Sequence, residues 1–168
     1  MKRIDVLYID DEDNNLNSFK AALRKEFKVK TAMDAEEGLI LAKNHEYKVV
    51  IADQRMPGMT GVEFFEKLVE INPDPIRILL TGYSDISSVI DAINRGEVYR
   101  FIDKPWNIEQ IKNAILNAAE IFDARKELKE KNTRLRKLHS EMNQFVYSLS
   151  SKTTVLFWFF SKANCNSK

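Results

Sequence analysis

The chain has 168 residues, a length that suits one domain with an appendage and is short for two complete domains. Apolar residues make up 44% of it and charged residues 30%, which provides enough apolar surface for a core and excludes the composition of a disordered protein. The formal net charge of +1 combines two unlike segments: residues 1–123 contain 16 Lys and Arg against 22 Asp and Glu, whereas residues 124–168 contain 10 against 3.

Short β-branched runs alternate with helical patterns along the first part of the chain. Ile4–Ile9 predicts a strand, and the spacing of Leu16, Phe19 and Leu23 predicts a helix over 14–26. Further along, we expect strands at 27–32, 49–52, 76–80 and 101–102, and helices from 34, over 61–71 and over 85–95. This alternation implies a parallel sheet with helices on both faces, because parallel strands need crossover connections.

Polar and charged side chains follow four of the predicted strands. Asp10 and Asp11 come after the first strand, Asp53 after the third, Thr81 after the fourth and Lys104 shortly after the fifth. In a doubly wound sheet, ligands bind at the carboxyl ends of the strands, near the point where strand order reverses. We therefore expect three carboxylates, one hydroxyl and one ammonium group to converge on one rim of the sheet.

Three carboxylates at one rim repel one another unless a cation lies among them. Mg²⁺ is the natural occupant, because it takes oxygen ligands and shares them with phosphate oxygens. Asp53 is the best-placed nucleophile, since it ends the central strand and precedes the turn-rich residues 54–61. Its attack on phosphorus would form an acyl phosphate, with charge neutralised by the metal and Lys104 and a hydrogen bond supplied by Thr81.

Four short motifs together resemble those of response regulator receiver domains, the CheY-like domains of two-component signalling. They are Ile9-Asp10-Asp11-Glu12, Asp53 with Met56-Pro57-Gly58-Met59-Thr60-Gly61, Leu80-Thr81-Gly82 and Asp103-Lys104-Pro105-Trp106. The resemblance covers residues 3–123. It implies an α/β fold with a doubly wound five-stranded parallel sheet of flavodoxin-like order 2-1-3-4-5, here followed by a long C-terminal helical extension.

The resemblance also assigns the central members of the site. It implies Asp53 as the phosphoacceptor and Mg²⁺ as the cofactor, held by Asp10, Asp11, Asp53 and the backbone carbonyl of Arg55. On their own, two acidic residues before a helix are often only N-terminal charges on a helix dipole. The order and spacing of all four motifs favour the functional interpretation.

Further positions complete this assignment. Thr81 and Lys104 would contact the phosphoryl group, and the peptide bond before Pro105 would be cis. Phe101 falls at the family's aromatic switch position, which turns inward when the threonine moves towards the phosphoryl group. An ordinary core or edge aromatic residue is the alternative interpretation of Phe101.

The residues after Pro105 contain no Gly or Pro and follow a long helical pattern. We expect a helix from Asn107 to Ser150, whose start at 108–118 lies on the face beside Phe101. Apolar residues then recur every seven positions, which predicts a parallel homodimer through a coiled coil, with a solvated single helix as the alternative. The first stripe is Ile121, Leu128, Leu135, Met142 and Leu149, and the second is Ala124, Lys131, Leu138 and Phe145.

These patterns divide the chain into a receiver domain at 1–123, a helical extension at 124–150 and a hydrophobic or disordered tail at 151–168. No helix-turn-helix pattern follows the receiver domain, so we expect no DNA-binding output. Residues 138–150 resemble the approach to the phosphoacceptor helix of sensor histidine kinases, but Ser151 stands where that family has its histidine.

The sequence shows no feature of an exported or membrane protein. Cys165 is the single cysteine, and acidic residues interrupt the N-terminal apolar run within ten positions. The longest uncharged apolar run, Val155–Phe160, has six residues, against about 20 for a bilayer span. We expect a cytoplasmic protein with no membrane partner.

The sequence therefore predicts a response regulator that is phosphorylated on Asp53 by a partner histidine kinase, depends on Mg²⁺ and signals through its helical extension. It would not be an enzyme beyond its self-catalysed phosphotransfer and dephosphorylation. The alternatives are a non-catalytic oligomerising adaptor, in which phosphorylation is dispensable, and a remnant of a hybrid kinase. No motif names the cognate kinase or the output partner, or sets the lifetime of the phosphorylated form.

Overall fold

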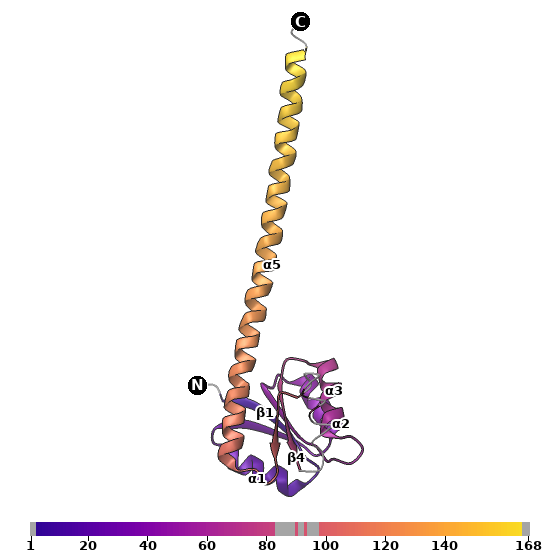
Figure 1. The fold of residues 1–168 in the computed structure, drawn as a ribbon, viewed down its shortest axis with the longest axis vertical. Coiled ribbons are helices and arrows are strands. Elements are labelled where there is room, and N and C mark those ends of the chain that lie inside the picture. Colours follow the sequence, from indigo (N-terminus) through magenta and orange to yellow (C-terminus); the bar gives the residue numbers. More distant parts are fainter. Residues whose placement is uncertain (1–2, 83–89, 91–92, 94–97, 166–168) are drawn as a thin grey trace. The chain divides into compact units, whose positions relative to one another are not determined.

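Strands and helices alternate along the chain, as the sequence predicts (Figure 1). The computed structural model describes residues 3–82, 90, 93 and 98–165, and side chains as far as residue 147. The strands are β1 Ile4–Ile9, β2 Phe27–Ala32, β3 Val49–Asp53, β4 Ile76–Thr81 and β5 Arg100–Asp103. The helices are α1 Asp13–Leu23, α2 Ala35–Asn44, α3 Gly61–Ile71 and α5 Ile108–Cys165.

The strands form one parallel sheet in the order β2-β1-β3-β4-β5, which confirms the predicted fold. Strand β1 pairs with both β2 and β3, so that Val6 lies opposite Val29 on one side and Val49 on the other. Strand order reverses between β1 and β3. The carboxyl ends of these two strands therefore border the crevice in which doubly wound folds bind ligands.

Helices cover both faces of the sheet, because successive strand residues point to opposite sides. Val6 and Tyr8 of β1 belong to the core cluster beneath α1 and the first turns of α5. Leu7 and Ile9 belong to the cluster beneath α2 and α3. None of these four side chains is exposed, so β1 is a central strand buried on both faces.

Side-chain caps define where two of the helices begin. At the start of α3, Thr60 Oγ1 accepts a hydrogen bond from the N–H of Glu63 at 3.2 Å, and the Glu63 carboxylate accepts one from the N–H of Thr60 at 2.8 Å. At the start of α5, Asn107 Oδ1 accepts from the N–H of Gln110 at 2.7 Å. These caps anchor the loops that follow β3 and β5, at the carboxyl edge of the sheet.

Of two further predicted helices, one lies mostly outside the described residues and the other is longer than expected. The helix expected at 85–95 lies outside the described residues, apart from Ile90 and Ile93, which are both helical. Helix α5 continues to Cys165, past the expected end at Ser150. The C-terminal sequence contains no Gly or Pro that would end it earlier.

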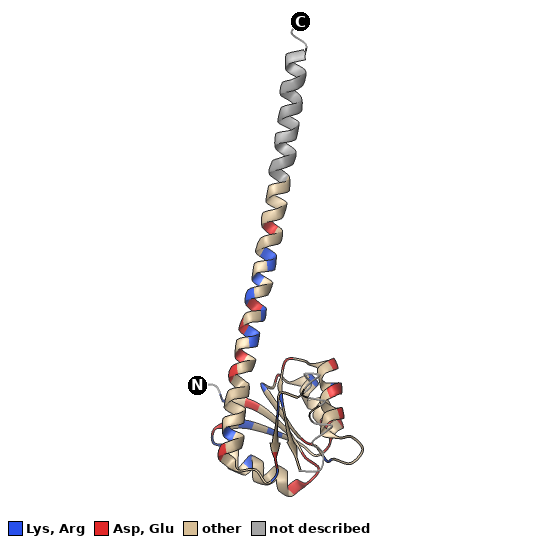
Figure 2. Cartoon of the chain, in the orientation of Figure 1, with Lys and Arg blue, Asp and Glu red and all other residues tan. Residues whose placement is uncertain are grey.

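The chain divides into two compact units, one ending at Ala124 and one beginning at Arg125. Lys and Arg are interleaved with Glu along the described side chains of the second unit (Figure 2). Across the residues that the structure covers, no helix has the length and apolar character needed to cross a membrane. We refer to the two units as the receiver unit and the extension.

Candidate functional site

Three polar side chains lie buried at the carboxyl ends of neighbouring strands. Asp10 follows β1, Asp53 ends β3 and Thr81 ends β4. All three are buried, although Asp and Thr are mostly exposed in proteins. The strand register places Asp53 opposite Leu80, one residue before Thr81. Because a buried charge is costly unless it is paired, both carboxylates need partners.

Lys104 supplies the positive partner for both carboxylates. Its Nζ lies 2.7 Å from Asp53 Oδ1 and 3.5 Å from Asp10 Oδ2. The N–H of Lys104 donates to the carbonyl of Thr81 at 2.8 Å, which ties its loop to β4. The peptide bond between Lys104 and Pro105 is cis, as the resemblance predicts. Four of the predicted site residues therefore come together at this edge.

Burial and ion pairing act in opposite directions on the charged pair. Burial raises the pKa of Asp53, and although the hydrogen bond and charge of Lys104 oppose this, the pKa stays above its ordinary value. Burial would lower the pKa of Lys104, but the contacts with Asp53 and Asp10 outweigh it and raise that pKa. Lys104 is therefore a persistent cation next to the Asp53 carboxylate.

Asp10 is held by donors that sequence analysis did not identify. The Tyr8 hydroxyl donates to Asp10 Oδ2, and the side-chain nitrogen of Asn15 lies 3.0 and 3.1 Å from the two carboxylate oxygens. The N–H of Glu12 adds a third donor at 3.0 Å. Burial and the nearby Asp10 raise the pKa of Tyr8, so its hydroxyl keeps its proton. The alternation of side chains along β1 could have predicted these donors in part, because residues two positions apart, such as Tyr8 and Asp10, point to the same side of the sheet.

Asp11 lies in a different setting, in an open hollow beside the loop between β3 and α3. The hollow has a volume of about 420 Å³ and is lined by Asp11, Gln54, Arg55, Met56, Pro57 and Thr60. Asp11 and Arg55 therefore share one solvent-facing space, whereas Asp10 is buried against Lys104.

The acidic residues supply only oxygen donors, which suits a hard cation such as Mg²⁺. Within the described ranges, no three His, Cys, Asp or Glu side chains are grouped so that they could hold a metal ion. An ion bound beside Asp11 would therefore need a backbone carbonyl, such as that of Arg55, or water to complete its coordination. Such mixed coordination is usual for Mg²⁺, so the residues present fit this ion.

Helix α3 begins in direct contact with the backbone of Asp53. A Cβ atom on Gly61 would lie 2.4 Å from the carbonyl oxygen of Asp53 and 2.6 Å from Leu79 Cδ1, so a larger residue does not fit without a shift. The carbonyl of Gln54 accepts from the N–H of Gly61 at 3.1 Å, and Gln54 Oε1 accepts from the N–H of Val62 at 3.2 Å. Asp53 is therefore carried by a backbone that α3 holds in place.

Thr81 and Phe101, the predicted switch residues, lie on neighbouring strands. The Thr81 hydroxyl donates to the carbonyl of Gly82 at 3.1 Å. Phe101 is half-buried and packs against the core cluster beneath α2 and α3. Asn117 of α5 lines one hollow with Phe101, so α5 starts beside Phe101 as predicted, but Ile111 and Ile115 pack on the opposite face of the sheet from the Phe101 ring. Alternate residues of β5 point to opposite sides, which separates them.

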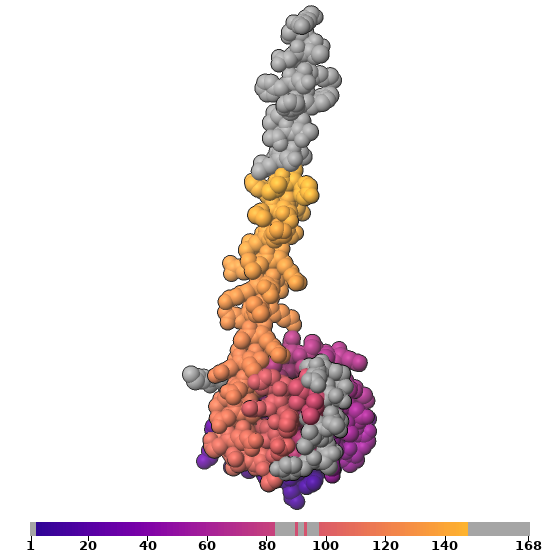
Figure 3. Space-filling model, viewed as in Figure 1, coloured from indigo at the N-terminus to yellow at the C-terminus, as the bar shows by residue number. Residues whose placement is uncertain are grey.

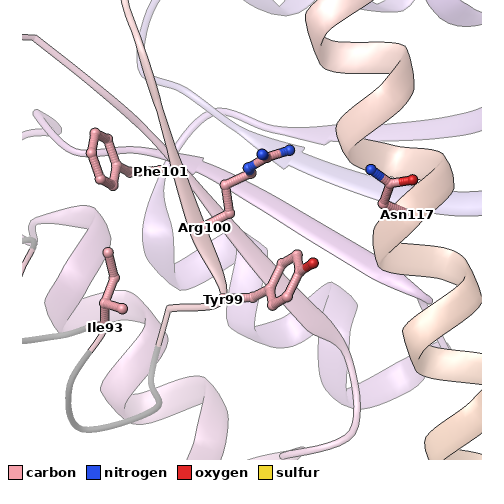
Figure 4. A pocket seen from close by; sticks show the side chains of 5 residues that line it. All are labelled: Ile93, Tyr99, Arg100, Phe101 and Asn117. Atoms are coloured by element: carbon pink, nitrogen blue, oxygen red, sulfur yellow. The ribbon is translucent and has the colours of Figure 1, made fainter.

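A second hollow, of about 460 Å³, lies between β5 and the start of α5. Its lining residues are Ile93, Tyr99, Arg100, Phe101 and Asn117. In Figure 4 the Phe101 ring points away from α5, whereas the Arg100 guanidinium points towards Asn117. Figure 3 shows residues of β5 and the first turns of α5 on one face of the receiver unit. Arg100 rather than Phe101 therefore faces α5 across this hollow.

The fold and the polar edge define a class of protein. A parallel sheet of order 2-1-3-4-5 with buried aspartates and a lysine at its carboxyl edge is the arrangement of CheY-like signalling domains. The family pattern described as "Response regulator receiver domain" matches residues 6–116. The chain belongs to the response regulator receiver family.

Comparison with individual proteins agrees with this assignment. The hydrogenase transcriptional regulatory protein HoxA of Cupriavidus necator is 35% identical over 119 residues, which is 71% of this chain and 25% of that protein. The chain thus spans about a quarter of the length of this curated relative.

Two solved structures share the fold over nearly their whole length. An adenylate cyclase structure from Rhodopirellula baltica has a TM-score of 0.75 and 33% identity, covering 77% of this chain and 96% of that one. A response regulator receiver domain protein from Clostridium thermocellum has a TM-score of 0.67 and 33% identity, covering 74% and 98%. These matches cover about three quarters of the chain.

Proposed function

We propose that this chain accepts a phosphoryl group on Asp53 from a partner histidine kinase in the cytoplasm, in a Mg²⁺-dependent reaction, and signals through its helical extension. One observation carries the proposal most: the Lys104 ammonium lies 2.7 Å from the Asp53 carboxylate in a buried pocket that also contains Asp10. A fixed cation beside a buried carboxylate suits charge stabilisation of a phosphoryl group transferred to that carboxylate.

The chemistry is one displacement at phosphorus. An Asp53 oxygen attacks the phosphorus of a phosphohistidine, a new P–O bond forms, and the P–N bond breaks. The electron pair stays on the imidazole nitrogen, which takes up a proton. Lys104 stays charged throughout and moves its contact from the carboxylate to the phosphoryl oxygens. Asp53 is an acceptor in this reaction, so the protein is a signalling protein rather than an enzyme with turnover of a separate substrate.

Asp11, Asp53 and the carbonyl of Arg55 would hold Mg²⁺, with Asp10 adding its negative charge. When bound, the ion supplies positive charge to the transferred phosphoryl group. Asp11 and Arg55 line the open hollow and are accessible from solvent. Asp10 already accepts hydrogen bonds from Tyr8, Asn15 and a backbone N–H, so its oxygens are less available as direct ligands.

Thr81 and Phe101 form the proposed switch. The Thr81 hydroxyl, now bonded to the Gly82 carbonyl, would turn to donate to a phosphoryl oxygen on Asp53. Phe101 is half-buried and borders the hollow next to α5, so it has space on one side and core on the other. An inward turn of Phe101 would change the shape of that hollow, which Arg100 and Asn117 also line.

The proposed partner of the extension is a second copy of this chain. Along the extension, large apolar side chains are more than half exposed at seven-residue spacing, including Leu128, Leu135 and Met142. An exposed apolar stripe of this kind is typical of a coiled-coil seam. Lys131 is the polar position of the proposed seam, in the second stripe. Its ammonium group lies 2.6 Å from the carboxylate of Glu127.

The alternative function is an adaptor whose extension oligomerises without phosphorylation. The same exposed stripe favours it, because pairing through the stripe needs no change at Asp53. The intact pocket of Asp10, Asp53 and Lys104 favours the phosphoacceptor function instead.

Intact mass measurement after incubation with acetyl phosphate and Mg²⁺ tests the proposal. The parent should gain the mass of one phosphoryl group, and Asp53→Asn should gain none. Asp74→Asn, which alters a carboxylate between α3 and β4, is the matched control and should label like the parent. Labelling of Asp53→Asn at the parent's level, or no labelling of the parent, would contradict the assignment.

A further inference from the structure

Three aromatic side chains form a continuous column beside the acidic pocket. The rings of Tyr8 in β1 and Phe19 in α1 are stacked, with centroids 4.1 Å apart and planes 26° apart. The ring of Phe19 meets Trp106, in the loop after β5, edge to face, with centroids 5.8 Å apart. Tyr8 and Phe19 are fully buried, and Trp106 packs against the same core cluster. Such aromatic pairs hold defined geometries.

Both ends of this column connect to the pocket. At one end the Tyr8 hydroxyl donates to Asp10 Oδ2. At the other end, Trp106 lies two residues after Lys104, whose Nζ lies 3.5 Å from that same Asp10 oxygen and 2.7 Å from Asp53 Oδ1. The contacts therefore close a ring that runs from Asp10 through the aromatic column and the Lys104 loop back to Asp10.

We propose that Tyr8 is a positioning residue for the phosphoacceptor site, which holds Asp10 and, through it, the Lys104 ammonium at the distance from Asp53 that phosphotransfer needs. This inference rests on the proposed phosphoacceptor function. Lys104 has a flexible stem whose ordering costs conformational entropy. A carboxylate fixed by Tyr8 and Asn15 confines the ammonium to one place before the phosphodonor arrives, which is where preorganised charge is effective.

A purely structural role for Tyr8 makes a different prediction. Its ring fills the core and stacks on Phe19, and phenylalanine would do the same without the hydroxyl. If burial of the ring were its whole role, Tyr8→Phe would leave the reaction unchanged. If the hydroxyl positions Asp10, the variant keeps the packing but loses phosphotransfer rate and alters the response of Trp106, which lies at the other end of the column.

The experiment compares the full chain with Tyr8→Phe and with Tyr47→Phe. Tyr47 is an equally suitable buried tyrosine, but its ring contacts His45, away from the pocket residues. All three carry Trp158→Phe, so that Trp106 is the single tryptophan and reports on the Lys104 loop. The measurements are the acetyl phosphate labelling rate as a function of donor concentration and the Trp106 fluorescence change on adding Mg²⁺ and then beryllofluoride.

We expect Tyr8→Phe to lower the labelling rate at saturating donor about tenfold, the size expected for losing one hydrogen bond to a charged group, with little change in the donor concentration that gives half the maximal rate. Its Trp106 fluorescence change with beryllofluoride should be smaller than in the parent. Tyr47→Phe should match the parent in both measurements.

Two results would overturn the inference. One is a Tyr8→Phe variant that labels at the parent's rate with the parent's fluorescence change. The other is an equal loss in Tyr8→Phe and Tyr47→Phe, which would indicate a general effect of losing a buried hydroxyl. A parent that does not label on Asp53 would instead contradict the proposed function itself, so the two failures are distinguishable. Phe19→Leu, which breaks the column but keeps the Tyr8 hydroxyl, should also reduce the fluorescence change.

Discussion

One helix, α5, contributes to both units and presents apolar side chains very differently in each. In the receiver unit, Ile111 and Ile115 are completely buried in the core cluster of the sheet. In the extension, Leu128 and Leu135 are 60% and 62% exposed. The spacing of apolar residues is helical in both places, so periodicity alone does not tell a face with a partner from a face without one. The receiver unit buries the apolar face of α5 in its own core, whereas the extension leaves its apolar side chains exposed, and we propose that a second copy of the chain covers them.

The largest expected effect is a difference in stability between equivalent leucine substitutions in the two units. Leu68 in α3 is completely buried, so Leu68→Ala should lower the free energy of unfolding of the receiver unit by about 2–5 kcal/mol. Leu135→Ala removes an exposed side chain of the same type and should change it by less than about 0.5 kcal/mol. Urea unfolding followed by circular dichroism measures both. Equal losses would show that the stability of the receiver unit depends on how the extension packs.

A smaller loss of stability is expected for a substitution at Gly61, where α3 meets β3. Gly61→Ala places a Cβ 2.4 Å from the backbone oxygen of Asp53, so the variant should lose about 1–3 kcal/mol of stability. Gly82→Ala is the matched control, because a Cβ there meets no heavy atom of the described residues within 4 Å. Thermal unfolding of both variants measures the difference. A Gly61→Ala protein as stable as Gly82→Ala would mean that α3 can move away from Asp53 at no cost.

Dimerisation of the chain should depend on the apolar stripe of the extension, which includes Leu128 and Leu135, and should respond to phosphorylation. We expect the parent to sediment as a dimer, and a chain ending at Ala124, or Leu128→Lys/Leu135→Lys, to sediment as a monomer. Beryllofluoride should change the dimer affinity by about 5–150-fold, which corresponds to about 1–3 kcal/mol of coupling. A parent that is monomeric at tens of micromolar contradicts the coiled coil. A dimer that ignores beryllofluoride supports the adaptor alternative.

The smallest expected effect concerns Asp5, at the amino end of β1. Burial alone would raise its pKa, but Lys28, 2.9 Å away, and His45 lower it. A lowered pKa in the folded state stabilises the protein above the ordinary value of 3.8, and this contribution is lost as the pH falls through the folded pKa. Asp5→Asn should therefore cost up to about 1 kcal/mol at pH 7 and nothing near pH 2. The measurement is the melting temperature of the parent and of Asp5→Asn at several pH values. A difference between them that does not change with pH would show that the ion pairs of Asp5 are not its cause.

Sequence patterns predicted the parallel sheet and the meeting of Asp10, Asp53 and Lys104, because the end of a parallel strand has a known place in the fold. The hydrogen bond from Tyr8 to Asp10 was not predicted, since an apolar strand pattern does not distinguish a hydroxyl with a partner from a core ring. The position of Phe101 beside the start of α5 was predicted, but not the face of the sheet to which its ring points, because a strand as short as β5 gives too few alternations to assign its two sides.

Two lysine–carboxylate pairs, one in the receiver unit and one in the extension, differ in how far water reaches them. Lys104 and Asp53 form their pair with side chains 31% and 10% exposed, whereas those of Lys131 and Glu127 in the extension are 69% and 65% exposed. Mobile ions screen exposed charges over about 10 Å at 0.1 M ionic strength and reach buried pairs much less. The salt concentration of the surroundings therefore acts on the charges of the extension while leaving those of Lys104 and Asp53 nearly unchanged.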